Sequence, residues 1–94
     1  MSFALKSEQV VNELSRIRIV PVLVLNDVES GLKMCEVLVE CGLPAAEVTF
    51  RTDAAEESIR IMSEKFPEML VGAGTVLTIE QADRAVKAGA KFIV

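Results

Sequence analysis

The chain of 94 residues carries a net charge of -4 and is 51% apolar and 26% charged, which is the balance of a globular protein with one core. It has no histidine and no basic cluster, so the composition excludes histidine-based catalysis and argues against a nucleic-acid surface. No apolar run is long enough to span a bilayer, and the first residues lack the pattern of a secretory signal. We therefore expect one cytoplasmic domain over residues 1–94, with neither a membrane nor a nucleic acid as partner.

Strand patterns and helix patterns alternate along the chain. A weak helix comes first, over residues 8–15, with Val11 and Leu14 predicted to face inward. Runs rich in β-branched residues then predict four strands, over residues 19–25, 45–50, 69–72 and 91–94. Pro21 cannot donate a ladder hydrogen bond, so the first strand should be an edge strand or carry a bulge.

Three further helices are predicted between these strands. Each begins with two residues at the capping-box spacing, namely Asn26 with Glu29, Asp53 with Glu56, and Thr78 with Gln81. Apolar stripes follow at helical intervals, formed by Val28, Leu32, Cys35 and Leu38, by Ala55, Ile59, Met62 and Phe66, and by Ile79, Ala82 and Val86. Strands joined through helices run parallel, so the pattern predicts an α/β fold.

The stretch EVTFRT places polar residues at alternate positions of a predicted strand. The alternation puts Ala45, Glu47 and Thr49 on one face, and Arg51 as well if the strand extends so far. In a barrel interior, Glu47 would be a desolvated carboxylate suited to proton transfer, and Arg51 would offer a guanidinium fork to an anion. The alternative is a solvent-washed face with a surface ion pair, and the pattern alone leaves both interpretations open.

The stretch VGAGTVL places two glycines at the end of a strand, before the helix predicted to begin at Thr78. Small residues there allow backbone amides to approach a phosphate or carboxylate, and the Thr75 hydroxyl adds a donor. The glycine spacing of a dinucleotide site or a P-loop is not met. A tight turn without a ligand is the competing interpretation.

The cysteines and lysines are predicted to be structural or solvated. Cys35 and Cys41 are six residues apart, which fits neither a redox pair nor a zinc site, so we expect buried free thiols, no metal and no cofactor. The five lysines are predicted to be surface residues, and none has the position of a Schiff-base amine: Lys6, Lys33, Lys65, Lys87 and Lys91.

The successive stretches VPVLVL, AAEVTFRT, VGAGTVLT and AGAKFIV closely resemble the N-terminal half of the KHG/KDPG (2-keto-3-deoxy-6-phosphogluconate) aldolase family. The resemblance covers essentially all 94 residues. It implies a (β/α)8 TIM barrel, of which this chain would be a half-barrel with four parallel strands and flanking helices. Members are typically homotrimers, so a homo-oligomer is expected.

The family's activity is that of a class I aldolase, a lyase of the Entner–Doudoroff pathway that forms a Schiff base. The resemblance implies cleavage of 2-keto-3-deoxy-6-phosphogluconate to pyruvate and glyceraldehyde 3-phosphate, of 4-hydroxy-2-oxoglutarate to pyruvate and glyoxylate, or of both. By the same resemblance, Glu47 matches the proton-shuttling glutamate, Arg51 an arginine that holds substrate, and Thr75 a threonine at the pyruvate portion. The family's Schiff-base lysine lies on a later strand, so we expect these 94 residues to be a fragment that is inactive alone.

Two other functions stay open. A half-barrel could be a self-associating structural module without catalysis, because an open apolar sheet face favours association. An independent phosphate-binding domain that uses GAGT is the third possibility, although no basic residue adjoins that stretch.

Overall fold

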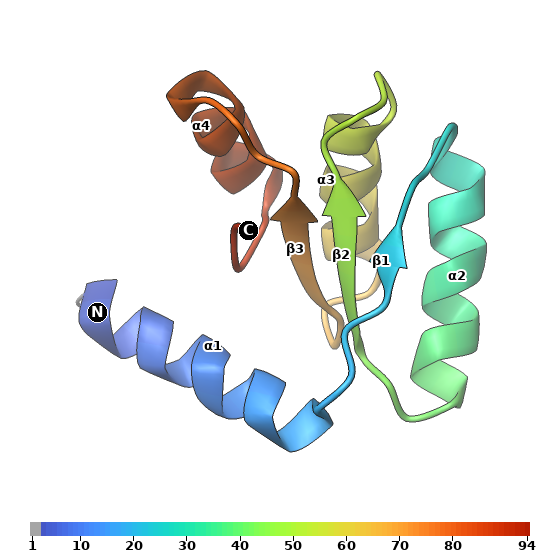
Figure 1. Cartoon of the computed structure of the whole chain (residues 1–94). Helices are drawn as coiled ribbons and strands as arrows, with labels where there is room; N and C mark the ends of the chain where they lie inside the picture. The colour runs from blue at the N-terminus through green and yellow to red at the C-terminus, as the bar shows by residue number, and fades with distance from the viewer. Residues whose placement is uncertain (1–2) are drawn as a thin grey trace.

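The computed structural model describes residues 3–94, which form a three-stranded parallel sheet and four helices (Figure 1). The sheet order is β1-β2-β3, so neighbours in the sheet are also neighbours in the chain. The predicted α/β class is confirmed. In chain order the elements are α1 (Phe3–Ile17), β1 (Val22–Leu23), α2 (Val28–Glu40), β2 (Ala45–Thr49), α3 (Ala55–Lys65), β3 (Leu70–Gly74) and α4 (Ile79–Ala88).

Helices α2, α3 and α4 form one layer against one face of the sheet. Helix α3 packs on β2 and β3 and is flanked by α2 and α4 (Figure 1). The core lies between this layer and the sheet, where Ile59 and Met62 of α3 are fully buried with Val48 and Val71 of the strands. Burial of these side chains, at about 25 cal/mol per Å² of apolar surface, holds the two layers together.

The fourth strand predicted over residues 91–94 is not confirmed as a strand of the sheet. Residues 91–94 form only one isolated parallel bridge, between Ala73 and Ile93. The amide of Ala73 donates to Phe92 O at 2.9 Å, and the amide of Val94 donates to Ala73 O at 2.8 Å. The segment thus lies beside β3, where the amide of Lys91 also donates to Val71 O at 2.8 Å, but its single bridge makes no ladder, and the sheet has three strands rather than four.

The first and third strands differ from the predicted bounds. Only residues 22–23 of the predicted 19–25 are strand, because Pro21 has no amide to donate, although its carbonyl accepts from the amide of Glu47 at 2.8 Å. The position of β1 at the edge of the sheet confirms the prediction made from that proline. Strand β3 runs two residues further than predicted, through Gly74.

The helix starts follow the predicted capping boxes in one case of three. Thr78 caps α4 as predicted, since its side chain accepts from the amide of Gln81. Helix α2 is capped by Asp27 rather than Asn26, because Asp27 Oδ1 accepts from the amide of Ser30 at 2.7 Å. Helix α3 begins after Ala54 with no side-chain cap, so the prediction for Asp53 is wrong.

The buried face of α4 also differs from the predicted stripe. Ile79 is 84% exposed and Val86 is 59% exposed, whereas Ala85 and Ala88 are buried. Short alanine side chains allow α4 to pack closely on α3, which leaves the larger apolar residues on the outer side. Ala82 is half-buried at the edge of the two faces.

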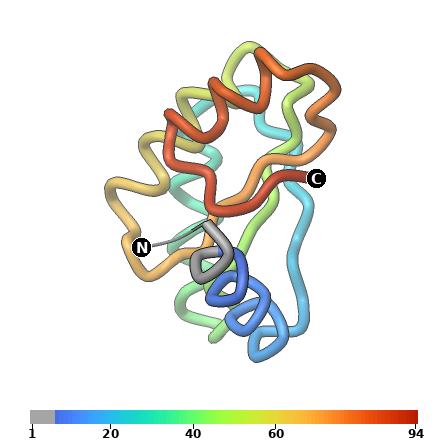
Figure 2. Tube along the Cα trace, turned by 90° about the vertical axis from the view of Figure 1, so that its left-hand side faces the viewer, coloured from blue at the N-terminus to red at the C-terminus, as the bar shows by residue number. Residues whose placement is uncertain are grey.

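Helix α1 stands apart from the helix layer. It lies below the sheet in Figure 1, and in Figure 2 it lies beneath the C-terminal segment. Val11 was predicted to face inward but is 59% exposed, and Leu14 is half-buried, because a groove of about 1130 Å³ separates α1 from residues 89–94. None of the described helices is both long and apolar enough to cross a membrane.

Candidate active site

The face of the sheet opposite the helix layer carries the polar residues of β2. Ala46 and Val48 belong to the core beneath the helices, so the alternation of the strand turns Ala45, Glu47 and Thr49 to the other face. Glu47 is half-buried there, and Thr49 is almost completely buried. The predicted division of the two faces is therefore what the fold shows.

The glycines of β3 make room for the Glu47 side chain. In the register of the parallel pair, Glu47 is the partner of Gly72, and Thr49 is the partner of Gly74. A Cβ added at Gly74 would overlap the carboxylate of Glu47, and one added at Gly72 would overlap the ring of Phe92. The Glu47 side chain thus leans along the sheet toward its carboxyl edge and lies against the backbone of Gly74.

Thr75 follows Gly74 and ends β3 in an unusual backbone conformation. Its φ of 55° lies in the left-handed region, which a β-branched residue adopts only when its surroundings enforce it. Thr75 is half-buried and begins the connection to α4. The carboxylate of Glu47 at Gly74 and the strained backbone of Thr75 therefore meet at one end of the sheet.

Arg51 is not brought to Glu47 by any direct contact. It is exposed in the turn after β2, and among the described side chains it forms no ion pair with Glu47. The turn itself is anchored, because the hydroxyl of Thr52 donates to the carbonyl of Leu25 at 2.5 Å and so joins the ends of β1 and β2. Arg51 lies in the turn that follows the last residue of β2, at the carboxyl edge of the sheet.

Thr49 and Thr52 are the residues of this edge whose contacts the sequence reasoning did not identify. The Oγ1 atom of Thr49 is buried and has no hydrogen-bond partner among the described residues. The alternation along EVTFRT was sufficient to place Thr49 on the Glu47 face, but not to show that its hydroxyl is unpaired. For Thr52 no local signal existed, because its partner is 27 residues earlier in the chain.

The lysines with described side chains lie away from Glu47. Four lysines are exposed, as predicted: Lys33, Lys65, Lys87 and Lys91. Lys6 falls outside the described side chains. The amide of Lys91 donates to the carbonyl of Val71 near the start of β3, which places this lysine toward the opposite end of the strand from Thr75. Lys33, Lys65 and Lys87 lie on α2, α3 and α4, the helix layer that covers the sheet face opposite to the Glu47 face.

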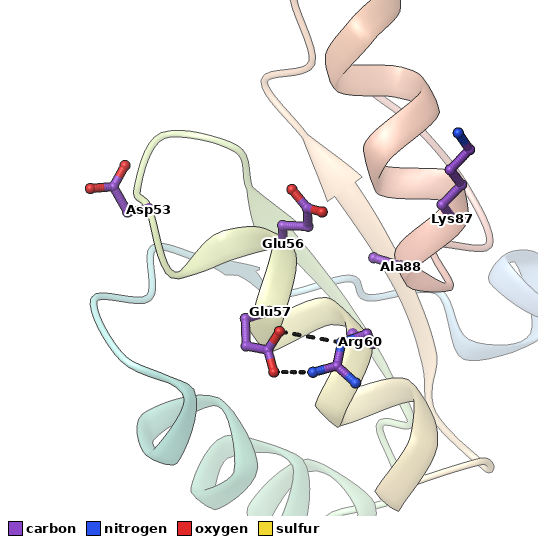
Figure 3. Close-up of a pocket in the computed structure, with 6 residues that line it drawn as sticks. All are labelled: Asp53, Glu56, Glu57, Arg60, Lys87 and Ala88. Carbon is purple, nitrogen blue, oxygen red and sulfur yellow. Dashed lines mark hydrogen bonds and ion pairs between the residues drawn. The ribbon is translucent and has the colours of Figure 1, made fainter.

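A second concavity, of about 290 Å³, lies on helices α3 and α4 rather than on the sheet (Figure 3). Two of its glutamates are held in ion pairs, since Arg60 pairs with Glu57, and Arg84, outside the lining, places Nε 2.7 Å from Glu56 Oε1. The hydrogen bond that Arg60 donates to the Glu57 carboxylate raises the pKa of Arg60 above its ordinary value. The lining residues are Asp53, Glu56, Glu57, Arg60, Lys87 and Ala88.

Comparison with known proteins identifies a family for this arrangement. Residues 10–94 match the family model described as KDPG and KHG aldolase. The 2-dehydro-3-deoxy-phosphogluconate aldolase of Haemophilus influenzae is 40% identical over 88 residues, which cover 94% of this chain and 42% of that protein. The chain thus spans less than half the length of this relative.

Two solved structures agree with this result. The 2-keto-3-deoxy-6-phospho-gluconate aldolase of Zymomonas mobilis superposes with a TM-score of 0.74 at 46% identity, over 79% of this chain and 35% of that one. The KDPG aldolase of Legionella pneumophila, with pyruvate captured as a covalent carbinolamine, gives a TM-score of 0.75 at 39% identity, over 79% of this chain and 36% of that one.

Proposed function

The chain belongs to the KDPG and KHG aldolase family, and from this premise we propose that its 94 residues carry the proton-transfer part of a class I aldolase site, with Glu47 as the acid–base group. The observation that carries the proposal is the position of the Glu47 carboxylate, half-buried against Gly74 at the carboxyl edge of a parallel sheet. Active sites of α/β barrels assemble at this edge.

The proposed reaction is cleavage of a 4-hydroxy-2-oxo acid to pyruvate and an aldehyde. The candidate substrates are 2-keto-3-deoxy-6-phosphogluconate and 4-hydroxy-2-oxoglutarate, as the family resemblance implies. An amine condenses with the keto group, and the resulting iminium accepts the electrons of the breaking carbon–carbon bond. A base takes the proton of the substrate's hydroxyl group as that carbon–carbon bond breaks and the aldehyde leaves. An acid then protonates the enamine carbon, and water hydrolyses the iminium to release pyruvate and the amine. Glu47 is proposed to do both, since one carboxylate serves alternately as base and acid.

Arg51 and Thr75 are proposed as substrate-binding residues. A guanidinium binds a carboxylate or phosphate through paired hydrogen bonds, and Arg51 is exposed at the edge where such a ligand would arrive. Thr75 adjoins Gly74 and thus stands beside the Glu47 carboxylate, which suits contact with the pyruvate portion. The amine nucleophile is proposed to come from outside these 94 residues, which would then be inactive alone.

The experiment is a chimera in which residues 1–94 replace the matching segment of the Haemophilus influenzae relative. We expect the chimera to release pyruvate from 2-keto-3-deoxy-6-phosphogluconate, measured with lactate dehydrogenase and NADH, and the 94-residue chain to release none. Glu47→Gln in the chimera is expected to lower kcat about 100-fold or more. A folded chimera without activity would disprove the proposal.

A self-associating half-barrel is the second candidate function. On β1 and on either side of it, Ile19, Val22 and Val24 are 58%, 61% and 57% exposed, so the edge strand of the sheet carries exposed apolar side chains. Two copies that cover these edges would bury apolar surface and pair strand edges. Sedimentation velocity at micromolar concentration tests this: a dimer or larger assembly is expected, and a monomer with slowly exchanging β1 amides would refute it.

A further inference from the structure

The hydroxyl of Thr49 is buried but forms no hydrogen bond with the described residues. The residue is 4% exposed, and its Oγ1 has no hydrogen-bond partner within the described part of the chain. Buried hydroxyl groups are normally paired, because an unmade hydrogen bond in the interior costs free energy. The fold therefore leaves the hydrogen-bonding capacity of this buried hydroxyl unsatisfied.

The hydroxyl lies on the same sheet face as the Glu47 carboxylate, at the same edge. Thr49 is the lateral partner of Gly74 in the parallel ladder, and the Glu47 carboxylate lies against that same glycine. No hydrogen bond joins Thr49 to Glu47 among the described residues. A donor and a carboxylate thus stand near one glycine without bonding each other, and Thr75 follows with its left-handed backbone.

Ser58 provides an internal comparison. Its Oγ is likewise buried without a partner, but Ser58 lies within α3, in the layer that packs on the sheet. Helix α3 covers the sheet face opposite to the Glu47 face, so Ser58 lies in the layer away from the candidate site. An unpaired hydroxyl alone is therefore not a site, and the position of Thr49 beside Glu47 and Gly74 is what distinguishes it.

We propose that the Thr49 hydroxyl is a ligand-binding group that donates a hydrogen bond to an oxygen of a small 2-oxo acid held between Glu47 and Thr75. The identity of this ligand rests on the proposed function. The carboxylate or keto oxygen of the ligand accepts the hydrogen bond, so the donor is satisfied in the bound state. A hydroxyl that is unpaired in the free protein contributes to binding without a competing internal partner.

Titration of the 94-residue chain with pyruvate, followed by amide NMR shifts, tests the inference. Thr49→Val removes the hydroxyl but keeps the shape of the side chain, Thr49→Ser keeps the hydroxyl, and Ser58→Ala removes the other unpaired hydroxyl. We expect saturable shifts at Thr49, Gly74 and Thr75. The Kd should rise about tenfold in Thr49→Val and stay within about threefold of wild type in Thr49→Ser and Ser58→Ala.

Thermal unfolding of the free proteins supplies the second readout. Because the hydroxyl is unpaired without ligand, Thr49→Val should leave the Tm unchanged or raised, as should Ser58→Ala. Equal pyruvate affinity in Thr49→Val, no saturable response in wild type, or a lowered Tm in Thr49→Val would each overturn the inference. These outcomes leave the proposed function standing, because that function is tested separately, by the aldolase activity of the folded chimera and of its Glu47→Gln variant.

Discussion

The carboxylate of Glu47 lies against the backbone of Gly74 on the neighbouring strand, in the space that a side chain at position 74 would occupy. The contact is diagonal, because Glu47 has Gly72 as its partner in the ladder and reaches two residues further along β3. A glycine at position 74 is therefore a condition for this placement of the carboxylate. Gly72 and Gly74 resembled a phosphate-binding turn in the sequence. In the structure, Gly72 leaves room for the Phe92 ring and Gly74 leaves room for the Glu47 carboxylate.

Gly74→Ala should displace the Glu47 side chain with little loss of stability. The added methyl group meets the movable end of a half-buried side chain, so the Tm should change little. In the chimera, misplacement of the carboxylate by about 1 Å should lower kcat about 100-fold. Gly72→Ala is the contrast, because its methyl group meets the Phe92 ring, and it should lower the Tm. Full activity in a folded Gly74→Ala chimera would contradict this account.

Glu47→Gln should not destabilise the fold of the 94-residue chain. No ion pair holds Glu47 among the described residues, so loss of its charge removes no stabilising contact. We expect a Tm equal to or above that of the wild type, measured by circular dichroism. Glu57→Gln, which breaks the pair with Arg60 on the surface of α3, is a matched control with an expected effect of under about 1 kcal/mol. A large fall in Tm for Glu47→Gln would instead make Glu47 a structural residue.

Asp27→Ala should lower the Tm at neutral pH by destabilising α2, and this effect should disappear in acid. The hydrogen bond from the Ser30 amide lowers the pKa of Asp27 below its ordinary value of 3.8. A lowered folded-state pKa means that the carboxylate stabilises the fold fully above pH 3.8 and loses this contribution as the pH falls through the lower folded-state value. The Tm difference between wild type and Asp27→Ala should therefore shrink below pH 3.8. Asn26→Ala, one residue earlier, should have no such effect.

The two thiols should differ sharply in reactivity. Cys35 is fully buried, and burial, with a smaller effect of Glu68, raises its pKa to about 11. Cys41 is exposed, so the prediction that both thiols are buried is wrong for Cys41. At pH 8, iodoacetamide should label one site rapidly, and Cys41→Ser should remove that rapid phase. Rapid double labelling of the native protein, followed by mass spectrometry, would show that α2 opens readily.

The sequence was sufficient for those features that depend on neighbouring residues. The alternation in AAEVTFRT assigned Glu47 to the face away from the helices, because the period of a strand is two regardless of its partners. The cap at Thr78 was likewise local, since the hydroxyl and the amide of Gln81 are three residues apart. At α2 the same rule failed by one residue, because Asn26 and Asp27 are both good capping residues.

Features that depend on register between segments were not predictable from the pattern. The approach of Glu47 to Gly74 requires the pairing of β2 with β3, which no local signal specifies. The exposed side of α4 has the same origin, because the choice of Ala85 and Ala88 over Ile79 and Val86 depends on how closely α4 packs on α3.

The 94-residue chain should form no Schiff base with pyruvate. A productive amine would have to share the uncovered sheet face with Glu47, whereas the described lysines are exposed, and Lys91 lies near the start of β3. Incubation with pyruvate and sodium borohydride, followed by intact-mass measurement, should show no stoichiometric adduct, while the chimera should gain one pyruvate-derived group. Peptide mapping then decides the alternative: a stoichiometric adduct on Lys6, Lys33, Lys65, Lys87 or Lys91 would mean that the chain carries its own nucleophile. In that case the division of labour proposed for Glu47 and an external amine would be wrong.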